Sequence, residues 1–177
     1  MVVSDFTPEE ERLIEDEYQA LLQDYLNSMH SQRIELIERA YHLAKQAHHG
    51  VRRLSGEPYM MHPLSVARIV VREIGLGSTS ICAALLHDVV EDTDYTLEDL
   101  KELGFSPQVL VAVALLTHEK EVPYLDYVNR LKDNPIAKAV KLADLEHNSD
   151  MTRLGPDDPR IPAFQEKYRR AKELLCE

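Results

Sequence analysis

The segment that most constrains the fold is residues 79–92, which read TSICAALLHDVVED. On a helix, these side chains are apolar nearly all the way round until the acidic end, which is typical of a helix buried on every side. Such a helix must be covered by other elements that turn apolar faces toward it. We therefore expect residues 79–92 to form the central helix of the fold.

The rest of the chain supplies amphipathic helices that could provide this cover. Thr7-Pro8-Glu9-Glu10 combines an N-cap, a proline at the first helical position and a capping-box glutamate, so a helix is expected to begin there. No stretch stands out with the period-2 alternation of a strand. Further helices are expected at about residues 31–48, 64–73 (started by Pro63), 122–132 and 135–148, after the caps Thr96 and Ser106, and around Phe164 to Leu175.

These elements predict one all-α domain over residues 1–177, built of eight or nine helices. Its acidic N-terminal helix, within residues 1–30, is expected to be a packing element or the contact of a homodimer.

The charge balance argues against two classes of partner. Lys and Arg number 20 against 31 Asp and Glu, a net charge of −11, whereas a non-specific binder of nucleic acid or anionic membranes carries a basic face. We expect no nucleic acid and no membrane as partner. A small anionic substrate stays compatible with the sequence, because local charge decides binding in a pocket.

Three further features indicate the compartment. The longest apolar run, Val109–Leu116, is too short to cross a bilayer. The N-terminal residues MVVSDFTPEEE lack the basic and apolar regions of a secretion signal. Cys82 and Cys176 are the only cysteines and cannot form a disulfide framework. A cytoplasmic location is therefore expected.

The acidic end of the buried segment is the first candidate site. His87 and Asp88 are adjacent, and Glu91 and Asp92 follow each of them by four residues, one helical turn further on. Three or more carboxylates crowded at the end of a buried helix are unfavourable without a cation. The alternative for the His-Asp pair alone is a hydrogen-bonded pair within the core.

Two other segments could complete a metal site. His62 stands at a helix entry, and Asp144 lies on one helix face with Lys141 and Asn148. His62, His87, Asp88 and Asp144 together form a mixed nitrogen and oxygen ligand set, which suits Mn²⁺ or Fe²⁺ better than a thiolate-bound zinc. Such a site can generate hydroxide near neutral pH. Spacing alone leaves open whether the four residues meet.

The segments AHHGVRRLSGEPYMMHP (47–63), ALLHDVVEDT (84–93) and VKLADLEHNSD (140–150) carry a family resemblance. Over about residues 33–176, the chain resembles the HD-superfamily hydrolase domain of RelA/SpoT-type alarmone enzymes, in the stand-alone form of the small alarmone hydrolases. HD alone is weak evidence, but these three motifs in this order are highly specific. With 177 residues, no synthetase or regulatory region is expected.

The resemblance implies an all-α HD-domain phosphohydrolase bundle, with Mn²⁺ held by His62, His87, Asp88 and Asp144. It implies that Glu91 and Asp92 act on the attacking water. The implied reaction removes the 3′-pyrophosphate from guanosine tetra- or pentaphosphate, leaving GDP or GTP and pyrophosphate. The alternatives are an adenosine alarmone or another phosphorylated nucleotide as substrate, and a non-catalytic nucleotide-binding protein.

Five residues are candidates for binding the nucleotide. By motif position, Arg53 resembles the family arginine near the base and phosphates, and Asn148 the residue that contacts the ribose. Lys141 matches a motif lysine but could equally be a surface or helix-pairing residue. Arg52 is either a phosphate contact or a solvated loop charge, and Tyr59 either packs on the nucleotide or anchors its loop.

Two departures from the family pattern bear on specificity, namely Leu54, where long relatives are often basic, and Glu146 in the last motif. Among the other residues, His48 and His49 are expected at the surface, with the lining of the cleft as the alternative, His147 as a packed, hydrogen-bonded residue, and Cys82 as a small core residue.

Overall fold

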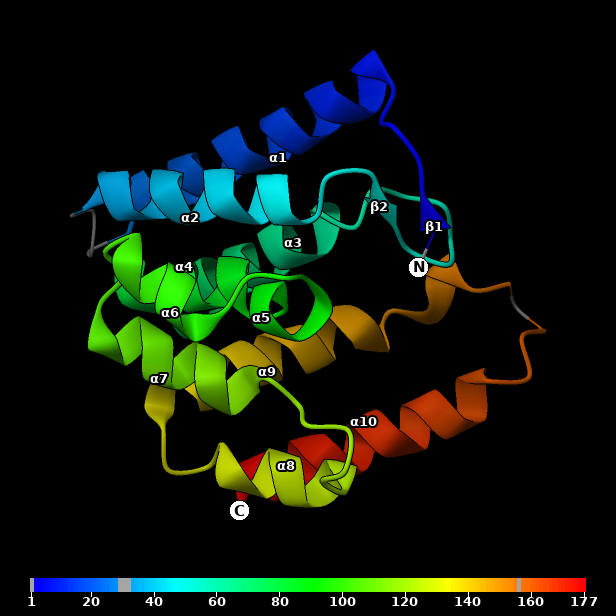
Figure 1. Cartoon of the computed structure of the whole chain (residues 1–177). Coiled ribbons are helices and arrows are strands. Elements are labelled where there is room, and N and C mark those ends of the chain that lie inside the picture. The colour runs from blue at the N-terminus through cyan, green and yellow to red at the C-terminus, as the bar shows by residue number, and fades with distance from the viewer. Residues whose placement is uncertain (1, 29–32, 156) are drawn as a thin grey trace.

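The computed structural model describes residues 2–28, 33–155 and 157–177. Helix α4 (Ser78–Leu86) is central, as predicted, and every residue from Ser80 to Leu86 is buried. It packs against α2 (Ile34–Ala47), α3 (Met61–Ile69), α7 (Pro107–Leu116) and α9 (Pro135–Ser149) (Figure 1). The apolar surface of α4 is covered on all sides, so a single hydrophobic cluster forms around it.

The remaining elements extend this core on two sides (Figure 1). Helix α1 (Pro8–Leu26) packs on α3, and α10 (Ile161–Cys176) packs on α9 and on α8 (Tyr124–Arg130). The other elements are short and comprise β1 (Val2–Val3), β2 (Val51–Arg52), the π-helix η1 (Val70–Ile74), α5 (Val89–Asp92), α6 (Leu97–Glu102) and the 3₁₀-helix η2 (Met151–Arg153). The fold is therefore all-α, as expected, and the described residues give nine helices when the single turn of α5 is counted with α4.

Local capping explains where the helices begin. The Thr7 side chain accepts from the Glu10 N–H while the Glu10 carboxylate accepts from the Thr7 N–H, which completes the capping box expected for α1. Thr96 and Asp99 form a second capping box at α6. Ser106 and Asn134 cap α7 and α9, each followed by a proline at the first helical position.

The structure corrects the expected helix over residues 79–92. Regular α-helix ends at Leu86, His87 and Asp88 form a turn, and the single turn α5 follows. At the break, the His87 ring nitrogen Nδ1 lies 2.6 Å from the carbonyl oxygen of Ala84. In a continuous α-helix, this carbonyl would accept from the N–H four residues further on. His87 and Asp88 therefore stand at a helix junction rather than on one continuous helix.

Three other expectations are corrected. The helix expected from Pro63 begins at Met61, and it passes into the π-helical turn of Val70–Ile74. The second helix begins at Ile34, while residues 31 and 32 lie outside the described part of the chain. A short antiparallel pair joins β1 to β2, where the sequence predicted no strand. No helix in the described ranges is long and apolar enough to span a membrane.

Candidate metal centre and active site

Four side chains from three parts of the sequence converge beside the α4–α5 junction. His62 comes from the first turn of α3, His87 and Asp88 form the junction, and Asp144 comes from α9. His87 Nε2 lies 2.9 Å from Asp88 Oδ2 and 3.9 Å from Asp144 Oδ1. His62 Nε2 lies 3.2 Å from Asp144 Oδ1 and 3.7 Å from Asp88 Oδ2. The structure thus brings together all four residues that the sequence singled out as ligands.

The chemistry of these donors fits a cation. His87 Nδ1 lies against a backbone carbonyl, which it meets as an N–H donor, so its Nε2 faces the centre and offers a lone pair there whenever the ring is neutral, as metal binding requires. That Nε2 atom is buried and has no hydrogen-bond partner among the described residues, although a carboxylate oxygen lies nearby. A lone pair and an anionic oxygen repel each other unless positive charge lies between them. The group of His62, His87 and Asp88 is accordingly able to hold a metal ion.

The second nitrogen of His62 is also engaged. Its Nδ1 lies 2.8 Å from Nδ1 of His147, as expected for a packed, hydrogen-bonded histidine at this position. If His62 offers the lone pair of Nε2 to a metal, its Nδ1 carries the proton and donates to His147. His147 thereby sets both the tautomer and the ring orientation of His62.

The pKa shifts of the residues at the centre also indicate that it attracts positive charge. Burial opposes protonation of His87, but the carboxylates of Asp88 and Asp144 outweigh it and raise its pKa to about 9. Burial also opposes ionisation of Asp144, yet Lys141 and the two histidines hold its pKa well below the ordinary value. For His62, burial prevails and lowers the pKa. The carboxylates stay ionised, and they draw protons or other cations to the site.

The two carboxylates expected to act on water lie one turn beyond the ligands. Burial and the nearby charges of Asp88 and Glu91 raise the pKa of Asp92 to about 6. Glu91 accepts a hydrogen bond of 2.8 Å from the backbone N–H of His118, which fixes its carboxylate at the edge of the site. The Tyr59 hydroxyl donates a hydrogen bond to Asp88 Oδ2, so Tyr59 fixes the carboxylate of this candidate metal ligand.

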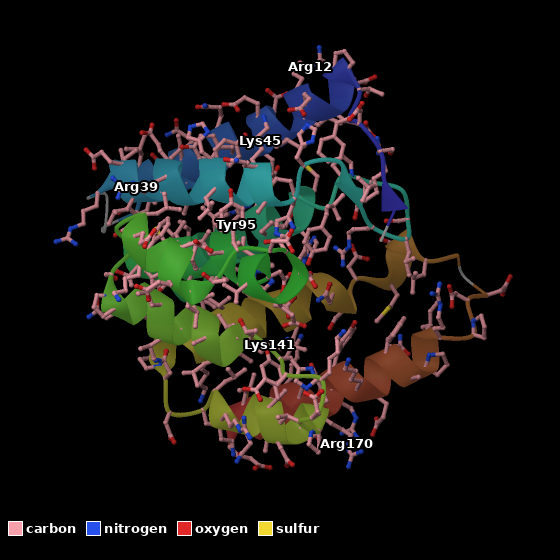
Figure 2. All side chains as sticks on the ribbon, in the orientation of Figure 1. Arg12, Arg39, Lys45, Tyr95, Lys141 and Arg170 are labelled. Atoms are coloured by element: carbon pink, nitrogen blue, oxygen red, sulfur yellow. The ribbon has the colours of Figure 1, made fainter. Side chains whose placement is uncertain are left out.

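A chain of hydrogen bonds links the centre to the loop after β2. Asn148 donates to Asp144 Oδ1 over 2.7 Å, and Arg53 Nη2 donates to the Asn148 Oδ1 atom over 2.8 Å. Arg53 Nη1 is buried without a hydrogen-bond partner in the described part of the chain, and its nearest carboxylate, Glu57 Oε1, lies 3.9 Å away, so it can still donate to a ligand. Lys141 is largely shielded from solvent beside the site and donates to Asp144 Oδ2 over 2.8 Å. In Figure 2, Lys141 lies between α9 and the pair formed by α8 and α10, whereas Arg12 and Arg170 lie near the outer edge of the view.

Two cavities meet at Asn148 and Tyr168. The first, of about 180 Å³, is lined by three of the four residues of the centre and will be called the metal-side cavity; its lining includes His87, Asp88, Glu91, Lys141, Asp144 and Lys167. The second, of about 250 Å³, has a largely apolar wall and will be called the outer cavity; its lining includes Arg53, Leu54, Tyr59, Met151, Leu154 and Phe164. A ligand with a charged end and a flat apolar part would fit across both.

Arg52 is the one candidate that the structure does not bring to this site. Its guanidinium bonds both carboxylate oxygens of Glu10, at 2.5 and 2.9 Å, on the N-terminal side of the loop. Arg52 and Arg53 are neighbours on an extended segment, so their side chains leave on opposite sides.

Sequence reasoning missed Lys167 and misplaced His48. Lys167 lines the metal-side cavity, with Nζ 4.1 Å from the centre of the Tyr124 ring. The expectation of a surface position for His48 is wrong, because His48 is only 1% exposed. It continues the buried face of α2 formed by Ile37, Tyr41 and Ala44, a spacing that could have revealed its burial. His49 is exposed and Cys82 is buried, as expected.

The fold and the paired His-Asp centre define a helical metal-site protein of the HD type. An HD-domain family model matches residues 40–147. The human protein named guanosine-3′,5′-bis(diphosphate) 3′-pyrophosphohydrolase MESH1 is 38% identical over 157 residues, covering 83% of this chain and 86% of its own length. A solved structure of a metazoan SpoT ortholog that hydrolyzes ppGpp superposes with a TM-score of 0.69 at 28% identity, covering 79% of this chain and 85% of that chain.

Some relatives are much longer proteins. The Streptomyces coelicolor GTP pyrophosphokinase is 39% identical over 121 residues. The match covers 63% of this chain but only 14% of the length of that pyrophosphokinase. The match to human MESH1 extends over most of both proteins. The chain belongs to the HD-domain family and, within it, to the group that contains the MESH1 proteins.

Proposed function

We propose that this protein is a metal-dependent hydrolase that removes the 3′-pyrophosphate from guanosine 3′,5′-bis(diphosphate) and its pentaphosphate analogue, releasing GDP or GTP and pyrophosphate. The observation that carries the proposal is the centre formed by His62, His87, Asp88 and Asp144, which opens into a cavity beside a second, largely apolar one. A nucleotide could place its highly charged 3′ end in the metal-side cavity and its base in the outer cavity. The names of the relatives support the same substrate.

The four residues of the centre would hold one divalent ion, and Mn²⁺ is the ion we propose, because the donors are imidazole and carboxylate and include no thiolate. When bound, such an ion supplies Lewis acidity that makes water a better nucleophile and stabilises charge on the phosphate. Tyr59 and His147 orient the ligand side chains, and Lys141 holds the second oxygen of Asp144.

The remaining steps belong to side chains around the centre. Asp92, with a pKa of about 6, is the base that accepts a proton from the attacking water, and Glu91 orients that water. The water oxygen bonds to the phosphorus next to the ribose, and the bond from that phosphorus to the 3′ oxygen breaks. The 3′ oxygen leaves as the nucleotide hydroxyl after taking up a proton. Arg53 and Asn148 bind the nucleotide beside the cavity wall.

The test is release of pyrophosphate from guanosine tetraphosphate by the purified protein, with Mn²⁺ and with a chelator. We expect turnover only with the metal, and no turnover for Asp88→Ala. The adenine 3′-pyrophosphate counterpart measures base preference, which bears on Leu54 in the outer cavity. Activity confined to nucleotides with 5′-phosphates alone would contradict the proposal.

A cytoplasmic location and a homodimer formed through the acidic helix α1 belong to the same proposal. Cell fractionation tests the first, and light scattering of the purified chain tests the second.

A further inference from the structure

The loop after β2 carries two residues of the candidate site on one side and a structural clamp on the other. Arg53 and Tyr59 turn toward Asn148 and Asp88. Arg52, between Val51 and Arg53, turns away toward the N-terminal arm, which we define as residues 2–10. The loop from residue 51 to residue 59 is therefore held from both sides.

Backbone pairing attaches the arm to the base of this loop. Val3 pairs with Val51 and Val2 with Arg52 in the β1–β2 ladder. The Ser4 N–H donates to the carbonyl of Gly50 over 2.8 Å. Gly50 has φ +71°, and a Cβ there would lie 3.3 Å from the Ser4 carbonyl oxygen, so the close approach favours glycine.

Arg52 is the centre of the attachment. Besides its two bonds to Glu10, it donates to the Ser4 hydroxyl over 2.6 Å and to the Asp5 carbonyl over 3.0 Å. It also donates to the carbonyl of Gly56 at the loop tip over 2.9 Å. Its guanidinium lies 5.3 Å from the Phe6 ring centre. One side chain thus connects the arm, the first turn of α1 and the tip of the loop.

Glu10 contributes to two local structures at once. Its carboxylate closes the capping box with Thr7 and accepts the bidentate pair from Arg52. The hydrogen bond from Arg52, with help from Thr7, lowers the pKa of Glu10 to about 2, so the pair stays charged across the working pH range. Bidentate arginine–carboxylate pairs fix orientation as well as supply energy.

The two ends of the loop are also tied to core helices, since the Val51 N–H donates to the His48 carbonyl over 3.1 Å at the end of α2, and the His62 N–H of α3 donates to the Tyr59 carbonyl over 2.9 Å. Between these ends, the Arg53 N–H donates to the Glu57 carbonyl over 3.0 Å, and the Tyr59 N–H donates to Val51 over 2.8 Å. These two bonds lie within the loop, and Arg52 adds the link from the loop tip at Gly56 to the arm. The orientation of Arg53 relative to Asn148 therefore depends on how firmly the base and tip are held.

We propose that Glu10 and Arg52 are positioning residues that clamp the 51–59 loop, so that Arg53 and Tyr59 are preorganised for the nucleotide. The kinetic part of this inference rests on the proposed function. The clamp lowers the entropy that the loop loses when the substrate binds, so its loss weakens binding more than it slows the chemical step.

The experiment compares Glu10→Gln with Glu9→Gln. Gln at position 10 retains an oxygen for the capping box but loses the charged pair, whereas Glu9 is an exposed acid of the same turn with no contact to Arg52 among the bonds described above. Hydrogen exchange of the amides of Arg53 and Tyr59 is measured first, since it needs no activity. We expect exchange about ten-fold faster in Glu10→Gln and unchanged exchange in Glu9→Gln.

The second measurement is the steady-state kinetics with guanosine tetraphosphate and Mn²⁺. We expect Glu10→Gln to raise KM by about five- to ten-fold while kcat stays within about two-fold of wild type. Arg52→Lys should give a smaller rise, because a single ammonium keeps the charge but loses the fork. Arg52→Gln alone also loses the bonds to Ser4, Asp5 and Gly56 and should be the more impaired single variant, and the double variant Glu10→Gln/Arg52→Gln should be no worse than it, because Glu10 acts on Arg52 through the same pair.

The outcomes separate the clamp from the proposed reaction. Unchanged exchange in Glu10→Gln, or faster exchange with an unchanged KM, would overturn the clamp. Absence of turnover in the wild type would overturn the proposed reaction, while the exchange result would still decide whether the arm holds the loop.

Discussion

His147 holds the outer nitrogen of a metal-ligand candidate, and its replacement should weaken metal binding without disturbing the four ligands. In His147→Phe, Nδ1 of His62 loses the acceptor that lies 2.8 Å away. Partners of this kind are typically worth 10–100-fold in metal affinity, so we expect a rise of about that size in the Kd for Mn²⁺. Electron paramagnetic resonance of free Mn²⁺ during titration measures it.

Two comparisons make the result specific. His147→Gln keeps a polar side chain that can accept from His62 and should recover part of the affinity. His42→Gln, an exposed change on α2, should have no effect. Equal Mn²⁺ affinity in His147→Phe and the wild type would show that His147 does not orient the ligand.

His48 should make the protein sensitive to acid. Burial lowers its pKa to about 4, against about 6.5 in the unfolded chain. Because the folded value is the lower one, the unfolded state binds the extra proton between pH 6.5 and 4, and stability falls as the pH drops through that window. The loss attributable to His48 is about 2 kcal/mol between pH 7.5 and 5.

Urea unfolding at the two pH values tests this. The difference in unfolding free energy between pH 7.5 and 5 should shrink by about that amount in His48→Phe, because phenylalanine fills a similar volume and has no group to protonate. An identical pH dependence in the variant and the wild type would be inconsistent with a neutral, buried His48.

At the level of single residues, the sequence predicted the candidate metal ligands, whose chemistry requires a partner, and missed the residues whose position depends on tertiary packing. The sequence could indicate the ligand set because a cluster of acids and imidazoles is unfavourable unless a cation binds to it. This set comprises His62, His87, Asp88 and Asp144. The burial of His48 and the pairing of Arg52 with Glu10 depend on which elements meet, and neither follows from local composition. Lys167 was missed because a lysine on an amphipathic helix looks like any solvated charge.

Among the elements, the break between α4 and α5 matters most for the site. The sequence indicated one helix over residues 79–92, on which His87 and Asp88 would point about 100° apart. The turn between the helices instead lets His87 Nε2 and Asp88 Oδ2 come within 2.9 Å. An apolar periodicity cannot reveal this break, because the residues on both sides of it are equally suited to a helix.

Helix α10 contributes a second lysine to the metal-side cavity. Lys141 is bonded to Asp144, whereas Lys167 lines the same cavity with its ammonium over the Tyr124 ring. Lys167→Met should raise KM for guanosine tetraphosphate by about ten-fold, the loss of one charge-assisted contact to phosphate. Steady-state kinetics at constant ionic strength measures this.

The matched control for Lys167 is Arg170→Met, on the same helix and at the periphery of the molecule (Figure 2). It should leave KM unchanged. Lys167→Arg, which keeps a cation, should stay within a few-fold of wild type. Equal KM values for Lys167→Met and Arg170→Met would remove Lys167 from the site.

For the molecule as a whole, the all-α class followed from the buried segment and the helix caps, but the tertiary contacts did not. The β1–β2 pair joins residues about fifty positions apart through strands of two residues each, too short to leave a periodic signal. The sequence predicted a packing or dimer role for the N-terminal helix, but not the contact of its Glu10 with Arg52. Long-range contacts of this kind depend on the whole fold, so a short stretch of sequence holds no signal for them.

A cation held by α3, the α4–α5 junction and α9 would join segments across the whole molecule, so metal binding should stabilise it globally. A ligand that binds only the folded state at 100 times its Kd adds about 2.7 kcal/mol, which for a chain of this size raises the Tm by about 5–10 °C. We expect one cooperative transition, as the proposed single domain requires, shifted upward by Mn²⁺. Asp144→Asn, which keeps the side-chain volume, should unfold in one transition that Mn²⁺ does not move. A shift of equal size in Asp144→Asn would mean that the ion binds elsewhere.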